Sequence, residues 1–411
     1  AVTNAGTLNL GAGTLAQAIT GTGTIATTGD VASNASNLGN VVTNTGHTLT
    51  LTGGQLEQTV TGGNVIIADD VTSDASIASA IAINTTKSLS ISADNVAGAI
   101  TNAGTLNLGT GTLAQNVNGD GTTNISGDVI VGANKNIINT VKIAENSSLE
   151  LNAGLIDATK ANITENSGTV IMNGGTLSSD VAGAYETKVG GDAVTTTTAY
   201  LNDNFTNKGT LNLTSDIDKD IKGNGTTVLS KEGTYVSVIG NRKIDGVLNS
   251  KGKTIDMQSP SSSVSYNTLS VGTLNLGQDI SLMLDSNIVT QEIDKISADA
   301  VIGNGKINML LDIPNRIDTV LTNPNITLNP IDAEEGEART NLAKALRYDG
   351  HSITSPIFEY TTNYDENTGL VHIAKKTGTD GFNKYLYTPS VVANTTAAMT
   401  TQIATLAMDK M

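Results

Sequence analysis

The chain has 411 residues, a formal net charge of −16, no Cys, no Trp and only 3% aromatic residues. The acidic balance argues against nucleic acid as a partner, because phosphate binding needs a cationic face. No run of 18 apolar residues is present, so no helix that spans a membrane is expected. Because Ala, Val, Ile and Leu carry most of the apolar content, we expect a thin core that repeats many times.

Internal repetition is the strongest pattern along the chain. Residues 2–31 recur with few changes at 100–129, and looser copies such as HTLTLTGG and KSLSIS fill the intervals. The pentapeptide GTLNL occurs four times, starting at Gly6, Gly104, Gly209 and Gly272. Repetition of this kind predicts one small structural unit that stacks on copies of itself.

Each repeat unit reads as a short strand. In TLNL, Leu8 and Leu10 point to one side and Thr7 and Asn9 to the other, as alternation in a strand requires. Gly and Asn flank these runs and allow tight corners. Residues 1–286 are therefore predicted to form an all-β, right-handed, single-stranded parallel β-helix (β-solenoid) with coils of about 20–25 residues. A β-sandwich would need more aromatic core residues and would lack the self-similarity.

The character of the chain changes after residue 286, and 287–390 is predicted to be a β-rich cap. Ala333 to Tyr348 has helical spacing of apolar residues, with acidic residues near its start. Ser355 to Lys375 reads as a hairpin with its turn at 365–369. Residues 391–411 are predicted to form a short helix that the end of the chain interrupts, which indicates an excerpt of a longer protein.

Together these features resemble the passengers of bacterial autotransporters (type V secretion) of the pertactin and AIDA-like kind. The resemblance rests on the NxGTLNL repeats, on IDKISADAVIGNGKINMLL at 293–311 and on the terminal helix from Thr395. It implies a secreted β-helix on the surface of a Gram-negative cell, with a C-terminal autochaperone-like cap and attachment to the outer membrane. The partner it implies is the protein's own C-terminal outer-membrane β-barrel, which 391–411 would enter as a linker helix.

Several patterns imitate catalytic or binding motifs. Gly11–Ala16 and Gly21–Ala26 fit GxGxxA, but their glycines read as turns. Asp216, Asp218 and Asp220 alternate with isoleucines and read as a solvated face, and Asp69-Asp70 reads as a turn. The three histidines, His47, His351 and His372, stand in unrelated contexts. We therefore predict no catalytic, cofactor-binding or metal-binding residues, and the sequence identifies no residues of a binding site.

The predicted function is surface display without catalysis: adhesion, self-association or masking of the cell. Partners would be host or neighbouring-cell surface molecules, or further copies of the chain. One alternative is a β-helix that acts on polysaccharides, like lyases or tailspikes, which an Asp/Lys/Arg cluster in a groove would indicate; the first 241 residues contain no Arg. Another alternative is an inert stalk that presents a functional region N-terminal to Ala1.

Overall fold

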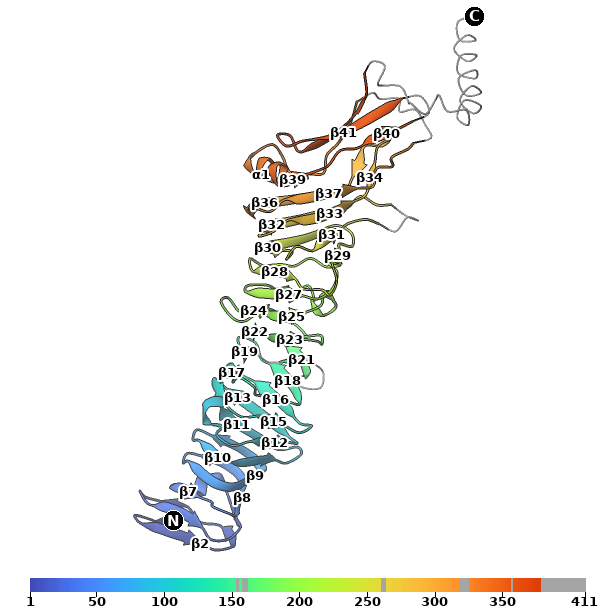
Figure 1. Cartoon of the computed structure of the whole chain (residues 1–411). Coiled ribbons are helices and arrows are strands. Elements are labelled where there is room, and N and C mark those ends of the chain that lie inside the picture. Colours follow the sequence, from blue (N-terminus) through green and yellow to red (C-terminus); the bar gives the residue numbers. More distant parts are fainter. Residues whose placement is uncertain (153–154, 157–161, 260–263, 318–324, 356–357, 378–411) are drawn as a thin grey trace, which may run out of the picture. The chain divides into compact units, whose positions relative to one another are not determined.

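The computed structural model describes residues 1–152, 155–156, 162–259, 264–317, 325–355 and 358–377. The chain is a parallel β-solenoid of about 14 turns, with 54% strand and 5% helix, which confirms the predicted all-β solenoid class (Figure 1). It forms two compact units. The first comprises Ala1–Thr214 and Lys222–Thr226, and the second comprises Ser215–Ile221 and Thr227–Met411.

Each coil of the first unit contributes short strands that pair in parallel with those of the next coil. One coil holds β12 (Ile100–Asn102), β13 (Thr105–Gly109) and β14 (Gly111–Leu113). Their partners are strands of the next coil, β15 (Val117–Asn118), β16 (Thr122–Ile125) and β17 (Asp128–Val131). The four GTLNL copies all lie in strands: β2 (Thr7–Leu10), β13, β27 (Thr210–Leu213) and β32 (Thr268–Leu276).

The coils of the first unit are shorter than predicted near the N-terminal end. Thr7 pairs with Thr24, and Thr24 pairs with Val41, so the residue number rises by 17 at each step. Thr105 and Thr122 are separated by the same step. The predicted coil length was an overestimate here, because very short strands joined by tight corners complete a turn with fewer residues.

The core consists of stacked aliphatic side chains that the strand register aligns. Ile91, Leu108, Ile125 and Ile143 occupy equivalent positions of four successive coils. All four are buried. Each coil therefore covers the apolar residues of the coil before it, and no single coil can bury its own.

Buried asparagines complete the corners. Asn102 is fully buried, donates to the carbonyl of Thr122 at 2.9 Å and accepts from the N–H of Gly104 at 3.1 Å. Asn4 makes the same two kinds of bond in the first repeat copy. The NxG of the repeat thus satisfies backbone groups where the chain leaves the sheet.

The second unit uses longer coils. Its principal sheet contains β30 (Arg242–Asn249), β32 and β36 (Lys295–Gly303), and the residue number rises by 27 from Thr268 to its partner Lys295. A further parallel sheet contains β29 (Tyr235–Ser237), β31 (Thr254–Asp256), β33 (Ile280–Leu284), β37 (Ile307–Leu311) and β39 (Leu346–Arg347). Parallel pairing therefore continues beyond residue 286, into the predicted cap.

The C-terminal elements depart from the solenoid pattern. The predicted helix is confirmed as α1 (Glu337–Ala345), and the predicted hairpin is confirmed as β41 (Glu359–Asp365) and β42 (Leu370–Lys375). These strands form an antiparallel sheet with β38 (Asn325–Leu328) and β40 (Ser352–Thr354). The division at 286 and 390 stays a prediction, and the linker helix at 391–411 lies outside the described residues.

Candidate functional site

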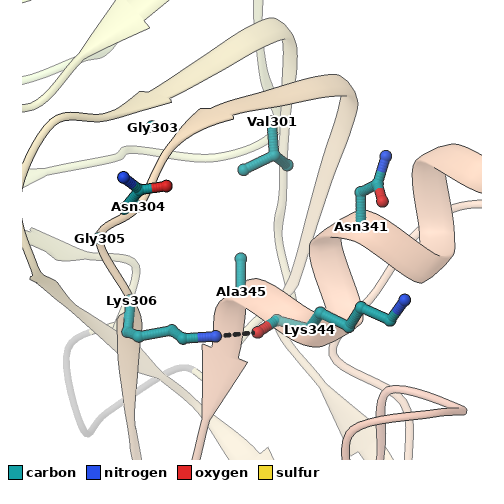
Figure 2. A pocket seen from close by; sticks show the side chains of 8 residues that line it. All are labelled: Val301, Gly303, Asn304, Gly305, Lys306, Asn341, Lys344 and Ala345. Carbon is teal, nitrogen blue, oxygen red and sulfur yellow. Dashed lines mark hydrogen bonds between the residues drawn. The ribbon is translucent and has the colours of Figure 1, made fainter.

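A cavity of about 340 Å³ lies between α1 and the turn that joins β36 to β37. In Figure 2 the Val301 and Ala345 side chains point toward one another across it. The Asn304 and Asn341 amides come from the turn and the helix, one on each side. The cavity is lined by Val301, Gly303, Asn304, Gly305, Lys306, Asn341, Lys344 and Ala345.

Two glycines let the turn run close to the preceding coil. Gly303 has a φ of +91°, and a Cβ there would stand 2.3 Å from the carbonyl oxygen of Leu276. A Cβ on Gly305 would stand 2.3 Å from the carbonyl oxygen of Gln278. The Gly305 N–H donates to the Leu276 carbonyl at 2.9 Å. The left-handed backbone and the close approach together favour glycine here, and they fix the wall of the cavity.

Arg339 holds the helix that forms the opposite wall. Its guanidinium donates to the carbonyl of Ala333 at 2.9 Å, to Asn329 Oδ1 at 2.9 Å and to the carbonyl of Thr368 at 3.0 Å. These bonds join α1 to the segment before it and to the hairpin turn. Leu342 and Ala345 are buried, which fixes the face that α1 turns inward.

The cavity carries positive charge in an acidic chain. The Lys306 ammonium donates to the carbonyl of Lys344 at 2.6 Å, at the C-terminal end of α1. Neither Lys306 nor Lys344 forms a salt bridge with an acidic side chain of the described residues. No acidic residue lines the cavity. An anion would therefore be the favoured occupant.

An ion pair stands beside the cavity. Arg347 Nη2 lies 2.9 Å from Asp279 Oδ2. The other carboxylate oxygen, Asp279 Oδ1, accepts from the backbone N–H of Lys306 at 2.8 Å. Both side chains are about half exposed. The pair therefore fixes the position of the turn while its charges cancel, and it leaves the two lysines as the net charge of the site.

The most perturbed carboxyl group lies elsewhere in the second unit. Asp294 is fully buried and accepts from the N–H groups of Asn267 at 2.6 Å and Asp285 at 2.7 Å. Burial raises its pKa to about 6, against the lowering effect of those two bonds. Asp285 in turn accepts from the N–H of Ser259 at 2.6 Å. These bonds close the base of the hairpin formed by β34 (Ser286–Asn287) and β35 (Glu292–Ile293), which is a structural role.

The histidines lie in separate places among the described residues. His47 lies in the first unit just before β8 (Thr48–Leu56). In the second unit, His351 Nδ1 is 2.9 Å from the Tyr348 hydroxyl, whose pKa is raised by burial. His372 lies in β42 opposite Thr327. The described residues contain no group of three or more His, Cys, Asp or Glu side chains that could hold a metal ion.

Two of the three aspartates that alternate with isoleucines have structural roles, and the third, Asp218, is exposed. Ile217 and Ile221 are buried as predicted. Asp216 accepts from Lys231 and from the Ser237 N–H, and Asp220 accepts from the Lys243 N–H. In each case a carboxylate outside the core bonds a backbone N–H of a later segment.

Asp69 and Asp70 were predicted to lie in a turn, and that prediction is wrong. Both lie inside the long strand β9 (Val60–Ser73), which bends with a register shift instead of breaking. Asp69 pairs with Lys87 at 2.8 Å, a bond that lowers the pKa of this exposed carboxyl. Asp70 accepts from the Ser88 N–H at 2.9 Å.

The glycine motifs lie in corners and short strands of the solenoid. β3 (Gly13–Leu15) and β5 (Thr24–Thr27) contain parts of the two GxGxxA segments, and no helix follows either segment as a dinucleotide site requires. Gly21 has a φ of +110°, and a Cβ there would stand 2.3 Å from the Asn4 carbonyl oxygen. Corner geometry therefore accounts for this glycine.

The first unit also presents a polar ladder on the outside of the solenoid. Asn124 donates to Asn107 at 2.8 Å, and Asn107 donates to Ser90 at 3.0 Å. The three side chains belong to successive coils and lie at equivalent register positions. We call Ser90, Asn107 and Asn124 the outer ladder. It offers hydroxyl and amide groups at the strand spacing of roughly 4.8 Å.

Comparison with known proteins adds no relative: no protein-family model, curated protein or solved structure matches the chain. Within the described residues, no helix has both the length and the apolar character needed to cross a membrane. The lysine-lined cavity escaped the sequence analysis because Lys306 and Lys344 are far apart in the chain. The only local signal is a lysine directly after the GNG turn at 303–305.

Proposed function

We propose that the chain is the passenger of a bacterial autotransporter, displayed on a Gram-negative cell surface, where it serves adhesion and display and not catalysis. One observation supports this most: the parallel coils of the second unit are followed by elements that cover the last coil. α1 packs against β36, and the backbone around Ile296 bonds to Pro330 and Asp332. A capped solenoid is the arrangement that the sequence resemblance implies.

The cap has a physical purpose in this proposal. An open solenoid end carries unpaired N–H and C=O groups that can pair with another chain. The N–H of Ile296 donates to the Pro330 carbonyl at 2.9 Å, and the Asp332 N–H donates to the Ile296 carbonyl at 3.0 Å. The covered edge would protect a surface protein from edge-to-edge aggregation. It would also let coils add in one direction while the chain is secreted through its own outer-membrane barrel.

The outward side chains suit adhesion through many weak contacts. The outer ladder repeats polar groups from coil to coil, so a partner could make the same contact several times. Host or neighbouring-cell surface molecules, or further copies of the chain, are the partners that such a surface would serve.

Localisation on intact cells tests the proposal. Antibodies to the purified chain should label unpermeabilised cells that express the complete gene, and external protease should remove the labelling. A cytosolic enzyme of the same cells serves as the control that protease must not reach. Labelling that needs permeabilised cells would contradict surface display.

A second function, cleavage of an acidic polysaccharide, is favoured by one observation. Asp279 pairs with Arg347 and accepts from the backbone N–H of Lys306, whose side chain lines the cavity, so an Asp, an Arg and a Lys lie near one another there. Incubation of the purified chain with polygalacturonate should then release new reducing ends. No release with the wild-type chain would exclude this substrate and leave the adhesive proposal intact.

A further inference from the structure

We propose that the cavity beside α1 binds the carboxylate of an acidic saccharide through Lys306 and Lys344. The proposal deepens the adhesive function above and rests on it only for its biological setting. Binding itself follows from the cavity and is measurable on the purified chain.

The charge at the cavity favours an anion. A helix C-terminus carries roughly −0.5 elementary charge. The Lys306 ammonium, of one full positive charge, bonds to the Lys344 carbonyl there, and Lys344 adds a second full charge from the last turn of α1. Arg347 and Asp279 cancel one another. The lining therefore stays positive, although the chain as a whole carries −16.

Donors remain for a ligand. An ammonium group has three N–H donors, and Lys306 uses one of them on the Lys344 carbonyl. The bond holds the Lys306 ammonium in place at the cavity (Figure 2). Lys344 is exposed, and it forms no salt bridge with the described residues. In Figure 2 the Lys344 ammonium points away from Lys306, so a carboxylate bound at Lys306 accepts from Lys344 as well only after the exposed Lys344 side chain turns toward the cavity.

The rest of the lining suits a sugar better than a bare anion. Asn304 and Asn341 each offer donors and an acceptor, as hydroxyl groups require, while Val301 and Ala345 form an apolar surface that a ring face can cover. A free phosphate or sulfate could accept from the lysines and the two amides, but it would leave the apolar surface of Val301 and Ala345 uncovered. The volume of about 340 Å³ lies at the lower end of the range of ligand sites.

Titration calorimetry of the purified full chain with tetragalacturonate tests the proposal. The fully methyl-esterified tetrasaccharide serves as the neutral probe, and sodium sulfate serves as the bare-anion probe. We expect binding of the acid and at least roughly tenfold weaker binding of the ester, because charge-assisted bonds to the carboxylate are lost. Tighter binding of sulfate than of tetragalacturonate would overturn the saccharide assignment.

A matched pair of variants locates the site. Lys306→Gln with Lys344→Gln should weaken tetragalacturonate binding at least roughly tenfold. The control is Lys251→Gln with Lys253→Gln, which changes the net charge equally. Lys253, like Lys306, donates to a backbone carbonyl, that of Gly233 at 2.7 Å. Thermal unfolding of each variant should confirm that it is folded.

The outcomes separate the two proposals. Equal weakening in both variant pairs, or none in either, would overturn the assignment to this cavity. Absence of wild-type binding would overturn the ligand class, whereas surface labelling would still support display. Binding at the cavity by a chain that is not displayed on cells would contradict the passenger proposal alone.

Discussion

The two units build the same kind of core from coils of different length. Near the N-terminal end the residue number rises by 17 from one coil to the next, as from Thr7 to Thr24. In the later coils of the second unit it rises by 27, as from Ile280 to Ile307. In the short coils nearly every residue lies in a strand or a tight corner. The long coils carry additional residues, and these make the 286–293 hairpin and the longer loops.

The difference between the units lies outside the core. Stacked aliphatic residues are buried in both units, so each coil stabilises its neighbours in the same way. The cavity and the buried Asp294 both lie in the second unit, outside the regular ladder. The cavity and the buried carboxyl thus arise where the coil exceeds what its core requires.

Truncation of core leucines should have the largest effect, and it should be equal in the two units. Leu108→Ala in the short coils and Leu282→Ala in the long coils each remove a fully buried side chain. We expect each to lower the free energy of unfolding of its own unit by about 3 kcal/mol. Hydrogen exchange read by mass spectrometry reports each unit separately. If only one of the two substitutions lowered the free energy of unfolding of its unit, the two cores would not be equivalent.

Glycine substitution tests the tight corners of the first unit. A Cβ on Gly98 would stand 1.7 Å from the Ser79 carbonyl oxygen, so Gly98→Ala should destabilise the unit by about 2 kcal/mol through forced backbone shifts. Gly11→Ala is the control, since nothing lies within 4 Å of its Cβ and its backbone is not left-handed. Urea unfolding curves give both values. Similar costs for the two substitutions would contradict the corner geometry.

The buried carboxyl should make the second unit more stable in mild acid. Asp294 has a folded-state pKa of about 6, above the ordinary 3.8, so the folded chain binds the proton more tightly than the unfolded chain. Its destabilising effect is present above pH 6 and disappears toward pH 4. Between pH 7 and pH 5 we expect a gain of about 1 kcal/mol, reduced by solvent screening.

The Asp294→Asn variant should lose this gain, as measured by the urea midpoint of the second unit at both pH values. Asp218→Asn, which removes an exposed carboxylate, is the control and should leave the gain unchanged. An undiminished gain in Asp294→Asn would assign the pH dependence to other groups.

The cavity lysines should have the smallest effect on stability. Lys306→Gln removes the ammonium that bonds to the Lys344 carbonyl at the C-terminal end of α1. It should lower the free energy of unfolding by about 0.5 kcal/mol. Lys344→Gln should cost less, about 0.3 kcal/mol, because Lys344 is an exposed cation in the last turn of α1 and forms no salt bridge with the described residues. Thermal unfolding of the two variants measures the difference. A cost above about 2 kcal/mol for Lys344→Gln would indicate a structural role.

Much of the fold was predictable because alternation and repetition reflect its physics. TLNL places leucines inward in every copy, and the helix near Leu342 has the expected spacing. Coil length was overestimated for the short coils, although Gly104-Thr105 recurs as Gly121-Thr122 one short coil later. The 17-residue repeat is hard to see in the sequence because the match of residues 2–31 to 100–129 is stronger, and these two segments lie several coils apart.

The site was less predictable than the fold. Lys306 and Lys344 meet only because α1 returns to β36 after a long excursion, and neither lysine stands in a motif. The pKa of Asp294 likewise depends on its burial beneath Asn267 and Asp285, which local sequence does not encode. Asp69 and Asp70 were misplaced because a solenoid strand can bend through a corner without ending.

Deletion of one coil tests the stacked-coil account most directly. Removal of residues 105–121 joins Gly104 to Thr122, which is the register partner of Thr105, and should leave the stack in register. Removal of 105–112 takes out less chain but leaves part of a coil. Far-UV circular dichroism with urea unfolding should show a folded, cooperative chain for the longer deletion and loss of the first unit's structure for the shorter one. A folded chain after the shorter deletion, or an unfolded first unit after the longer one, would contradict the account.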